Sequence, residues 1–146
     1  MPRPARRLAG TPLPEGPVVL GLETGGFHLG VSVWRLPEAM GAPQTQWHLL
    51  EVMSARLGHQ HARTLLTQVD AMLSRQELTP SDIALIGVGR GPGGFTGVRV
   101  GMATALGVGL GLGATVWPVD SLAVLARHAA GHPGVVVPLI DARKSE

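Results

Sequence analysis

Apolar positions divide the first third of the chain into short runs with the two-residue repeat of β-strands. Residues 18–24 (VVLGLET) form an apolar run typical of a buried strand, and residues 28–35 (HLGVSVWR) alternate between apolar and other positions. Turn-forming residues 23–26 lie between the two runs and predict a hairpin. A third strand is predicted at residues 46–54, so the fold is expected to begin with three consecutive strands.

The repeat then changes to that of an amphipathic helix. Residues 59–77 predict the first helix because apolar side chains recur there at helical spacing, at Leu65, Leu66, Val69, Met72 and Leu73. The apolar run at residues 83–89 predicts another buried strand. A glycine-rich loop follows, and residues 96–112 predict a second helix.

The remaining elements complete an alternating pattern. Residues 114–119 predict a strand, residues 121–130 a helix with Asp120 or Ser121 as its N-cap, and residues 135–141 a last strand. The order β-β-β-α-β-α-β-α-β predicts an α/β fold with a mixed sheet whose later strands are parallel and joined by helices. This is the layout of an actin-like, or ribonuclease-H-like, lobe.

Composition narrows the possible chemistry. The 146 residues include 21 glycines and 12 prolines, so the backbone makes many tight turns or close approaches. The absence of cysteine excludes disulfides, thiolate metal sites and cysteine nucleophiles, and favours a cytoplasmic protein. A formal net charge of +2 is weak support for nucleic-acid binding.

Two segments raise the question of membranes and export. Residues 1–17 are rich in proline and arginine, lack the apolar centre of a secretory signal, and predict a disordered arm that is either a solvated tail or a phosphate-binding segment. Residues 100–119 carry no charge and are long enough to span a bilayer. Their glycines, and the Gly-Ala-Thr step at residues 113–115, favour a buried helix followed by a strand.

The glycine loop is the first candidate for chemistry. Residues 89–94 (GRGPGG) match the G-x-G-x-x-G pattern of dinucleotide-binding turns, but they follow the fourth predicted strand and the expected acidic residue is missing. Glycines at a helix start either expose backbone amides to an anion or only turn the chain, and both interpretations stay open. The weak candidates for binding a cofactor are Glu23, Gly91, Gly93, Gly94 and Thr96, the last also a possible N-cap.

The helix after the loop carries a row of small residues. Gly97, Gly101, Ala105, Gly109 and Gly113 recur every four positions, beside a stripe of Val98, Met102, Leu106 and Leu110. Such a row lets another backbone approach closely, either within the chain or from a second protein. The second alternative predicts an interface formed by Leu65, Val69, Met72, Gly97, Arg99, Gly101, Met102, Ala105 and Gly109.

Catalytic groups are few. His128 and His132 are four residues apart, but Gly131 and Pro133 interrupt the helix there, so no histidine pair with metal-binding spacing is expected. Glu23, Asp120 and Asp141 end strands and can in principle cluster as a carboxylate set, although Asp120 is equally suited to cap a helix. We expect no catalytic residue, no metal site and no cofactor.

The segment at residues 89–126, GRGPGGFTGVRVGMATALGVGLGLGATVWPVDSLAVLA, resembles the segment that marks the TsaB (YeaZ) family. VVLGLETGGFHLGVSV resembles the opening strand pair of that family, HARTLLTQVDAML its first helix, and PLIDARKSE the start of its second half. The resemblance covers residues 18–146. Glu23 stands where the family more often has Asp, and Gly94 where it often has Ser.

The resemblance implies an actin-like fold and a role in making threonylcarbamoyladenosine in tRNA. It implies a non-catalytic scaffold whose N-terminal helices pair with the catalytic paralogue TsaD and with a second copy of the scaffold. The scaffold recruits the ATPase TsaE and contacts tRNA indirectly. The histidine motif of the paralogue falls on Ser121 and Leu125, which cannot replace imidazole ligands. The expected parts are an arm (1–17), an N-terminal actin-like lobe (18–134) and the first strand of a missing or truncated second lobe (135–146).

Two other functions remain as alternatives. In the first, the chain is a nucleotide-binding phosphotransferase-like enzyme of the actin-like fold, which uses Glu23, the glycine loop and Asp141. In the second, the arginine-rich arm binds tRNA directly.

Overall fold

The computed structural model describes residues 16–36, 47–56 and 61–140, without the side chains of residues 61–63. The elements are β1 (Val18–Glu23), β2 (Leu29–Arg35), β3 (His48–Ala55), α1 (His61–Arg75), η2 (Pro80–Asp82), β4 (Ile83–Gly89), α2 (Phe95–Leu112), β5 (Thr115–Val119) and α3 (Ser121–His128). The expected arm, residues 1–17, lies outside the described residues except for its last two.

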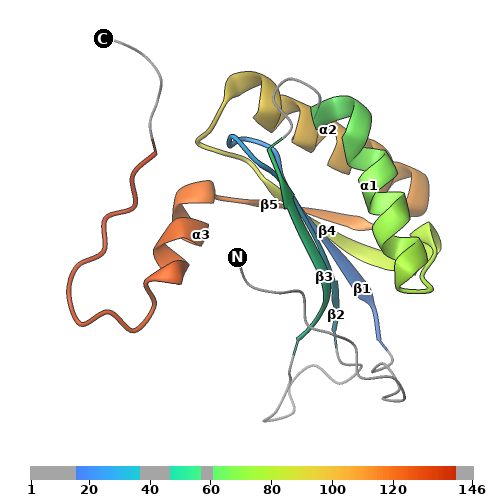
Figure 1. Cartoon of the computed structure of the whole chain (residues 1–146), viewed down its shortest axis with the longest axis horizontal. Helices are drawn as coiled ribbons and strands as arrows, with labels where there is room; N and C mark the ends of the chain where they lie inside the picture. The colour runs from blue at the N-terminus through green and yellow to red at the C-terminus, as the bar shows by residue number, and fades with distance from the viewer. Residues whose placement is uncertain (1–15, 37–46, 57–60, 141–146) are drawn as a thin grey trace.

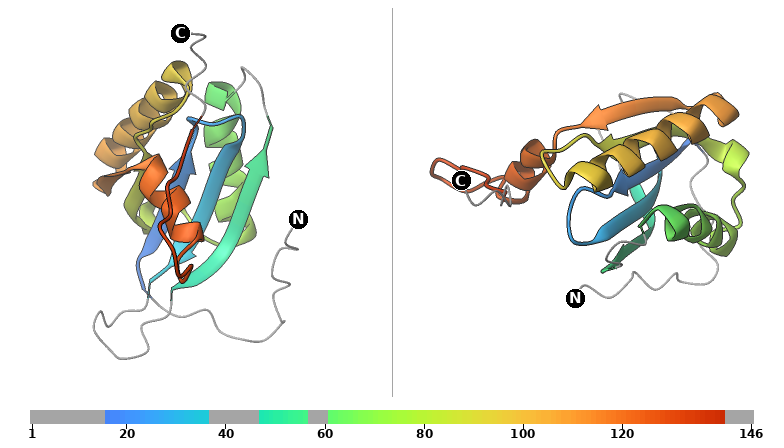
Figure 2. Two further views of the ribbon diagram at one scale, coloured as in Figure 1. Left: turned by 90° about the vertical axis from the view of Figure 1, so that its left-hand side faces the viewer. Right: turned by 90° about the horizontal axis from the view of Figure 1, so that it is seen from above.

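The five strands form one mixed sheet in the order β3-β2-β1-β4-β5. β2 pairs antiparallel with β1 and with β3, whereas β4 pairs parallel with β1 and with β5. A parallel pair needs a crossover connection, which α2 supplies between β4 and β5. α1 and α2 cover the same face of the sheet (Figure 1, Figure 2). The predicted mixed α/β sheet with three leading strands is confirmed.

The hydrophobic core lies between the sheet and these two helices. Alternate residues of the central strands point toward the helices, and Leu20 of β1, Val33 of β2 and Ile86 of β4 are buried. Leu65 and Met72 of α1 meet them from the other side. Burial of one such side chain is worth about 1.5–3 kcal/mol, so this layer supplies most of the stability of the lobe.

The predicted elements agree closely with the observed ones up to residue 128. Residues 83–89 form β4 as expected, α2 begins one residue earlier than predicted, and α3 ends at His128 and not at residue 130. The N-cap of α3 is Asp120, whose Oδ1 accepts hydrogen bonds from the amides of Leu122 and Ala123, each 3.0 Å long. These bonds satisfy two of the amides at the helix start.

The last predicted strand, at residues 135–141, is wrong for the residues that are described. Residues 135–140 have no regular secondary structure, and Val135 and Leu139 are 91% and 82% exposed. An apolar run becomes a strand only when a neighbouring strand satisfies its amides and carbonyls, and the sheet of this lobe ends at β5. Apolar composition alone therefore misled the prediction.

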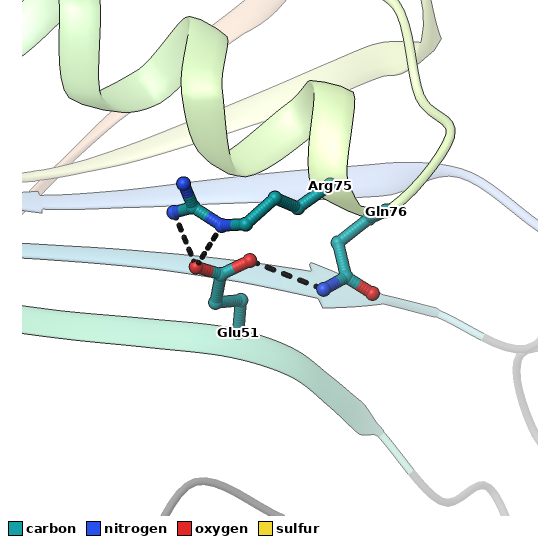
Figure 3. Close-up of polar contacts among 3 residues, drawn as sticks. All are labelled: Glu51, Arg75 and Gln76. Carbon is teal, nitrogen blue, oxygen red and sulfur yellow. Dashed lines mark hydrogen bonds and ion pairs between the residues drawn. The ribbon is translucent and has the colours of Figure 1, made fainter. Parts of the chain in front are cut away.

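An ion pair ties the end of α1 to the edge strand β3 (Figure 3). The Glu51 carboxylate accepts hydrogen bonds from Arg75, at 3.0 Å from Nε and 2.6 Å from Nη2, and from Nε2 of Gln76 at 3.1 Å. The hydrogen bonds to Glu51 raise the pKa of the Arg75 guanidinium above its ordinary value. The contact joins the end of the helix to the edge of the sheet.

Within the described residues, α2 is the one helix long and apolar enough to cross a membrane. Three of its small residues, Gly101, Ala105 and Gly109, are buried. Packing against the sheet accounts for these three residues, whereas most of the helix is not buried within the described residues.

Candidate functional site

The carboxyl ends of β1 and β4 meet the start of α3 around Glu23. The Glu23 carboxylate accepts a hydrogen bond from the amide of Gly25 at 2.7 Å and one from Oγ of Ser121 at 3.2 Å. Gly89 lies directly against the same carboxylate, which occupies the space where a Cβ would stand. Glu23 therefore braces three elements, and both its oxygens are engaged within the chain.

Thr24 anchors the turn after β1 to α2. Its side chain is buried, and its hydroxyl donates a 2.7 Å hydrogen bond to the carbonyl of Gly97. A Cβ at Gly97 would lie 3.0 Å from the carbonyl carbon of Thr24, and one at Gly101 would lie 3.3 Å from the Cβ of Thr24. The two glycines are small because this turn packs directly on the helix backbone.

The glycine loop packs against the same turn. The amide of Gly94 donates a 2.6 Å hydrogen bond to the carbonyl of Gly25, and the amide of Ser121 donates one of 2.9 Å to the carbonyl of Gly91. A Cβ at Gly93 would lie 2.8 Å from the carbonyl oxygen of Gly25. Close packing within the chain thus explains these glycines without a bound anion.

The polar groups of three candidate cofactor residues are engaged with other residues of the chain, Gly25 and Ser121. Glu23, Gly91 and Gly94 all take part in the hydrogen bonds described above, and Gly91 adopts a positive φ of 90°. Thr96 is exposed and is not the N-cap of α2, since Gly94 occupies that position. The predicted cap at Thr96 is wrong because the helix begins one residue before it.

The carboxylate set that was considered as a possibility gains no support from the described residues. Asp120 caps α3 and lies 3.6 Å from the guanidinium of Arg90, while Asp141 lies outside the described residues. In the part of the chain that the structure describes, no three side chains of the types His, Cys, Asp and Glu gather as a possible metal site.

The residues predicted to form an interface mostly face the interior of the chain. Leu65, Val69, Met72, Gly101, Ala105 and Gly109 are buried in the lobe itself, and Gly97 lies against Thr24. The prediction that the small-residue row faces a second protein is therefore corrected: the row faces the chain's own turn and sheet. Of the predicted residues, Arg99 is exposed and Met102 is half-buried.

A different part of the same two helices is open. A groove of about 360 Å³ runs between α1 and α2, with Leu20 and Leu22 of β1 on its floor. Leu66 and Leu112 line the groove, and Leu110, on the outer side of α2, is 88% exposed. Sequence analysis placed Leu110 in an apolar stripe but omitted it from the interface, because the periodicity alone does not say where the stripe leaves the core.

The chain is similar to proteins of one family. A family model described as "TsaD: tRNA N6-adenosine threonylcarbamoyltransferase" matches residues 53–146. The "tRNA threonylcarbamoyladenosine biosynthesis protein TsaB" of Bacillus subtilis is 27% identical over 128 residues, which are 88% of this chain and 52% of that protein. The protein of the same description from Haemophilus influenzae is 36% identical over 91 residues, 59% of this chain and 37% of that protein.

A solved structure shares the fold. YeaZ from Pseudomonas aeruginosa is 27% identical, and the match covers 80% of this chain and 49% of that one with a TM-score of 0.64. The shared architecture confirms the predicted α/β fold of the actin-like, ribonuclease-H-like class. The chain spans about half the length of the relatives it matches.

Proposed function

The chain belongs to the TsaB (YeaZ) family, within the wider family that the TsaD model describes, and from this we propose that it is a non-catalytic scaffold of cytoplasmic threonylcarbamoyladenosine synthesis. In this proposal the outer faces of α1 and α2 bind the catalytic paralogue TsaD, and bind a second copy when the paralogue is absent. TsaE joins through that complex, and the scaffold itself transfers no group.

The observation that carries the proposal is the open apolar surface of α1 and α2. The groove between the helices is lined by Leu66, Val108 and Leu112, and Leu106 and Leu110 of α2 are exposed as well. Exposed apolar side chains in this number are typical of a protein contact. Two helices of a partner can add their own apolar faces to such a surface by ridges-into-grooves packing.

The residues of α3 and the end of β1 support a non-catalytic role. Ser121 and Leu125, the positions on which the paralogue's histidines fall, lie on α3, where Ser121 donates a hydrogen bond to Glu23. Neither side chain is a metal ligand of the imidazole type. Glu23, the acidic residue at the end of β1, is engaged in bracing β1 against α3.

Co-purification with TsaD and light scattering of the chain alone test the proposal. Leu110→Glu places a charge on the outer face of α2 and is expected to disperse the homodimer and to prevent capture by TsaD. Leu125→Glu on α3, where Leu125 is also exposed, is the matched control and is expected to change neither. A wild-type chain that stays monomeric and fails to capture TsaD would refute the proposal.

Substitutions in the small-residue row cannot serve this test. Gly101 and Ala105 are buried against Thr24 and the sheet, so an arginine at either position would disrupt the lobe itself. A loss of dimer in such variants would report unfolding and not the loss of a contact.

A further inference from the structure

Both phenylalanines of the chain are exposed at one edge of the lobe. Phe27 lies in the turn between β1 and β2 and is 57% exposed, and Phe95 opens α2 and is 69% exposed. The 2.6 Å hydrogen bond from the amide of Gly94 to the carbonyl of Gly25 holds the two segments side by side, as Figure 1 shows. With about 3.8 Å between consecutive Cα atoms, the two rings start from backbone positions no more than about 16 Å apart.

Each ring carries an arginine. The guanidinium of Arg99, one helical turn after Phe95, lies 3.6 Å from the centre of the Phe95 ring, and that of Arg56 lies 5.8 Å from the Phe27 ring. Arg56 follows β3 and Arg99 belongs to α2, so two separate elements repeat the same pairing. A guanidinium that lies over a ring keeps its N–H groups directed sideways, where they can donate to an anion.

The charge of this edge is positive on its outer side. Arg56 and Arg99 are exposed, as is Arg90 at the end of β4, where its guanidinium lies 3.6 Å from Asp120. The carboxylate at the centre of the edge belongs to Glu23, and its hydrogen bonds direct it toward Gly25 and Ser121 and not outward. The acidic side chains described at this edge therefore repel an approaching anionic chain only weakly.

Exposed aromatic rings alternating with arginines match the chemistry of unpaired nucleotides. A base stacks on an aromatic ring or on a guanidinium plane, and arginine donors hold the phosphates between bases. The glycines next to the rings in the sequence, Gly26, Gly93 and Gly94, are exposed. A protein partner is matched better by the leucines that line the groove between α1 and α2.

We propose that this edge binds single-stranded RNA, with Phe27 and Phe95 each stacking on one base and with Arg56 and Arg99 holding the adjoining phosphates. The proposal goes beyond the scaffold role, in which contact with tRNA is indirect, and it does not depend on the pairing of α1 and α2 with a partner.

Fluorescence anisotropy of a short labelled single-stranded RNA, titrated with the full chain at low salt, tests the proposal. Phe95→Leu keeps an apolar side chain but removes the stacking surface, and it is expected to weaken binding about tenfold. Phe95→Trp is expected to keep or improve binding. Arg99→Gln is expected to reduce the slope of log affinity against log salt by about 0.7, which corresponds to one lost phosphate contact.

Leu110→Gln on the outer face of α2 is the matched control and is expected to leave RNA affinity unchanged, whatever it does to self-association. The proposal is overturned if the wild-type chain does not bind the oligonucleotide, or binds a duplex of the same length equally well. It is also overturned if Phe95→Leu binds the RNA as the wild type does, since leucine lacks the flat aromatic face on which a base stacks.

Discussion

The inner face of α2 has no charged residue and its outer face has Arg99 alone, yet the two faces pack in opposite ways. On the inner face, Gly97 and Gly101 lie so close to Thr24 that a methyl group has no room. On the outer face, Gly107 and Gly111 have open space around them, and Leu110 projects into solvent. A small residue in a helix is therefore a sign of close packing only where another backbone actually approaches.

The largest expected effect comes from adding one methyl group to the inner face. In Gly97→Ala the new Cβ would collide with the backbone carbonyl of Thr24, which cannot rotate away. We expect a loss of about 1–3 kcal/mol in the free energy of unfolding, the usual cost of overpacking. Urea denaturation measures it, and a loss below about 0.5 kcal/mol would mean that the turn is not held against the helix.

Removing the hydroxyl that joins the turn to the helix should have the next largest effect. Thr24→Val keeps the shape of the buried side chain but leaves the carbonyl of Gly97 without its 2.7 Å hydrogen bond. The expected loss of unfolding free energy is about 1–2 kcal/mol. The control is Thr104→Val on the groove side of α2, which is expected to change the unfolding free energy by less than about 0.5 kcal/mol.

On the outer face, the substitution made at Gly97 should have the opposite sign. A Cβ at Gly107 meets nothing within 4 Å, so Gly107→Ala gains helix propensity without a clash. We expect the unfolding free energy to rise by about 0.5–1 kcal/mol. A decrease of similar size would show that another molecule covers this face in solution. Denaturation at lower protein concentration would then turn the decrease in unfolding free energy into an increase.

The smallest effect on stability is expected from Leu110→Gln. Leu110 is 88% exposed, so its loss should change the unfolding free energy of the monomer by less than about 0.5 kcal/mol. Denaturation at several protein concentrations separates this term from self-association, because a dimer contributes stability that grows with concentration. A large concentration-independent loss would place Leu110 in the core and contradict the comparison of the two faces.

Most of the fold could be predicted from local patterns. The apolar run at residues 83–89 forms β4, and the turn signal at residues 23–26 joins two antiparallel strands. The run at residues 135–141 had equal apolar content, and its described residues form no strand. The difference is the neighbour: β4 pairs with β1 and β5, whereas residues 135–140 lie beyond the last strand of the sheet.

The candidate sites were predicted less well. The glycine loop was correctly placed between β4 and α2, but the partners of its glycines, Gly25 and Thr24, are about seventy positions earlier in the sequence. The ring and guanidinium pair at Phe95 and Arg99 has a signal in its spacing of four, which sequence reasoning overlooked. The pair at Phe27 and Arg56 had no such signal, since the pairing of β2 with β3 brings its two segments together.

Local patterns along the chain were sufficient to predict most of the strands and helices, because these depend on residues a few positions apart. The motifs at residues 89–126 were sufficient to indicate the family. Only the tertiary structure decided which face of α2 is buried within the chain. The four-residue repeat of small side chains indicates that another backbone segment approaches the helix. Which segment approaches depends on contacts across the sheet. Here the turn at Thr24 fills that space, and the leucines of the outer face stay exposed.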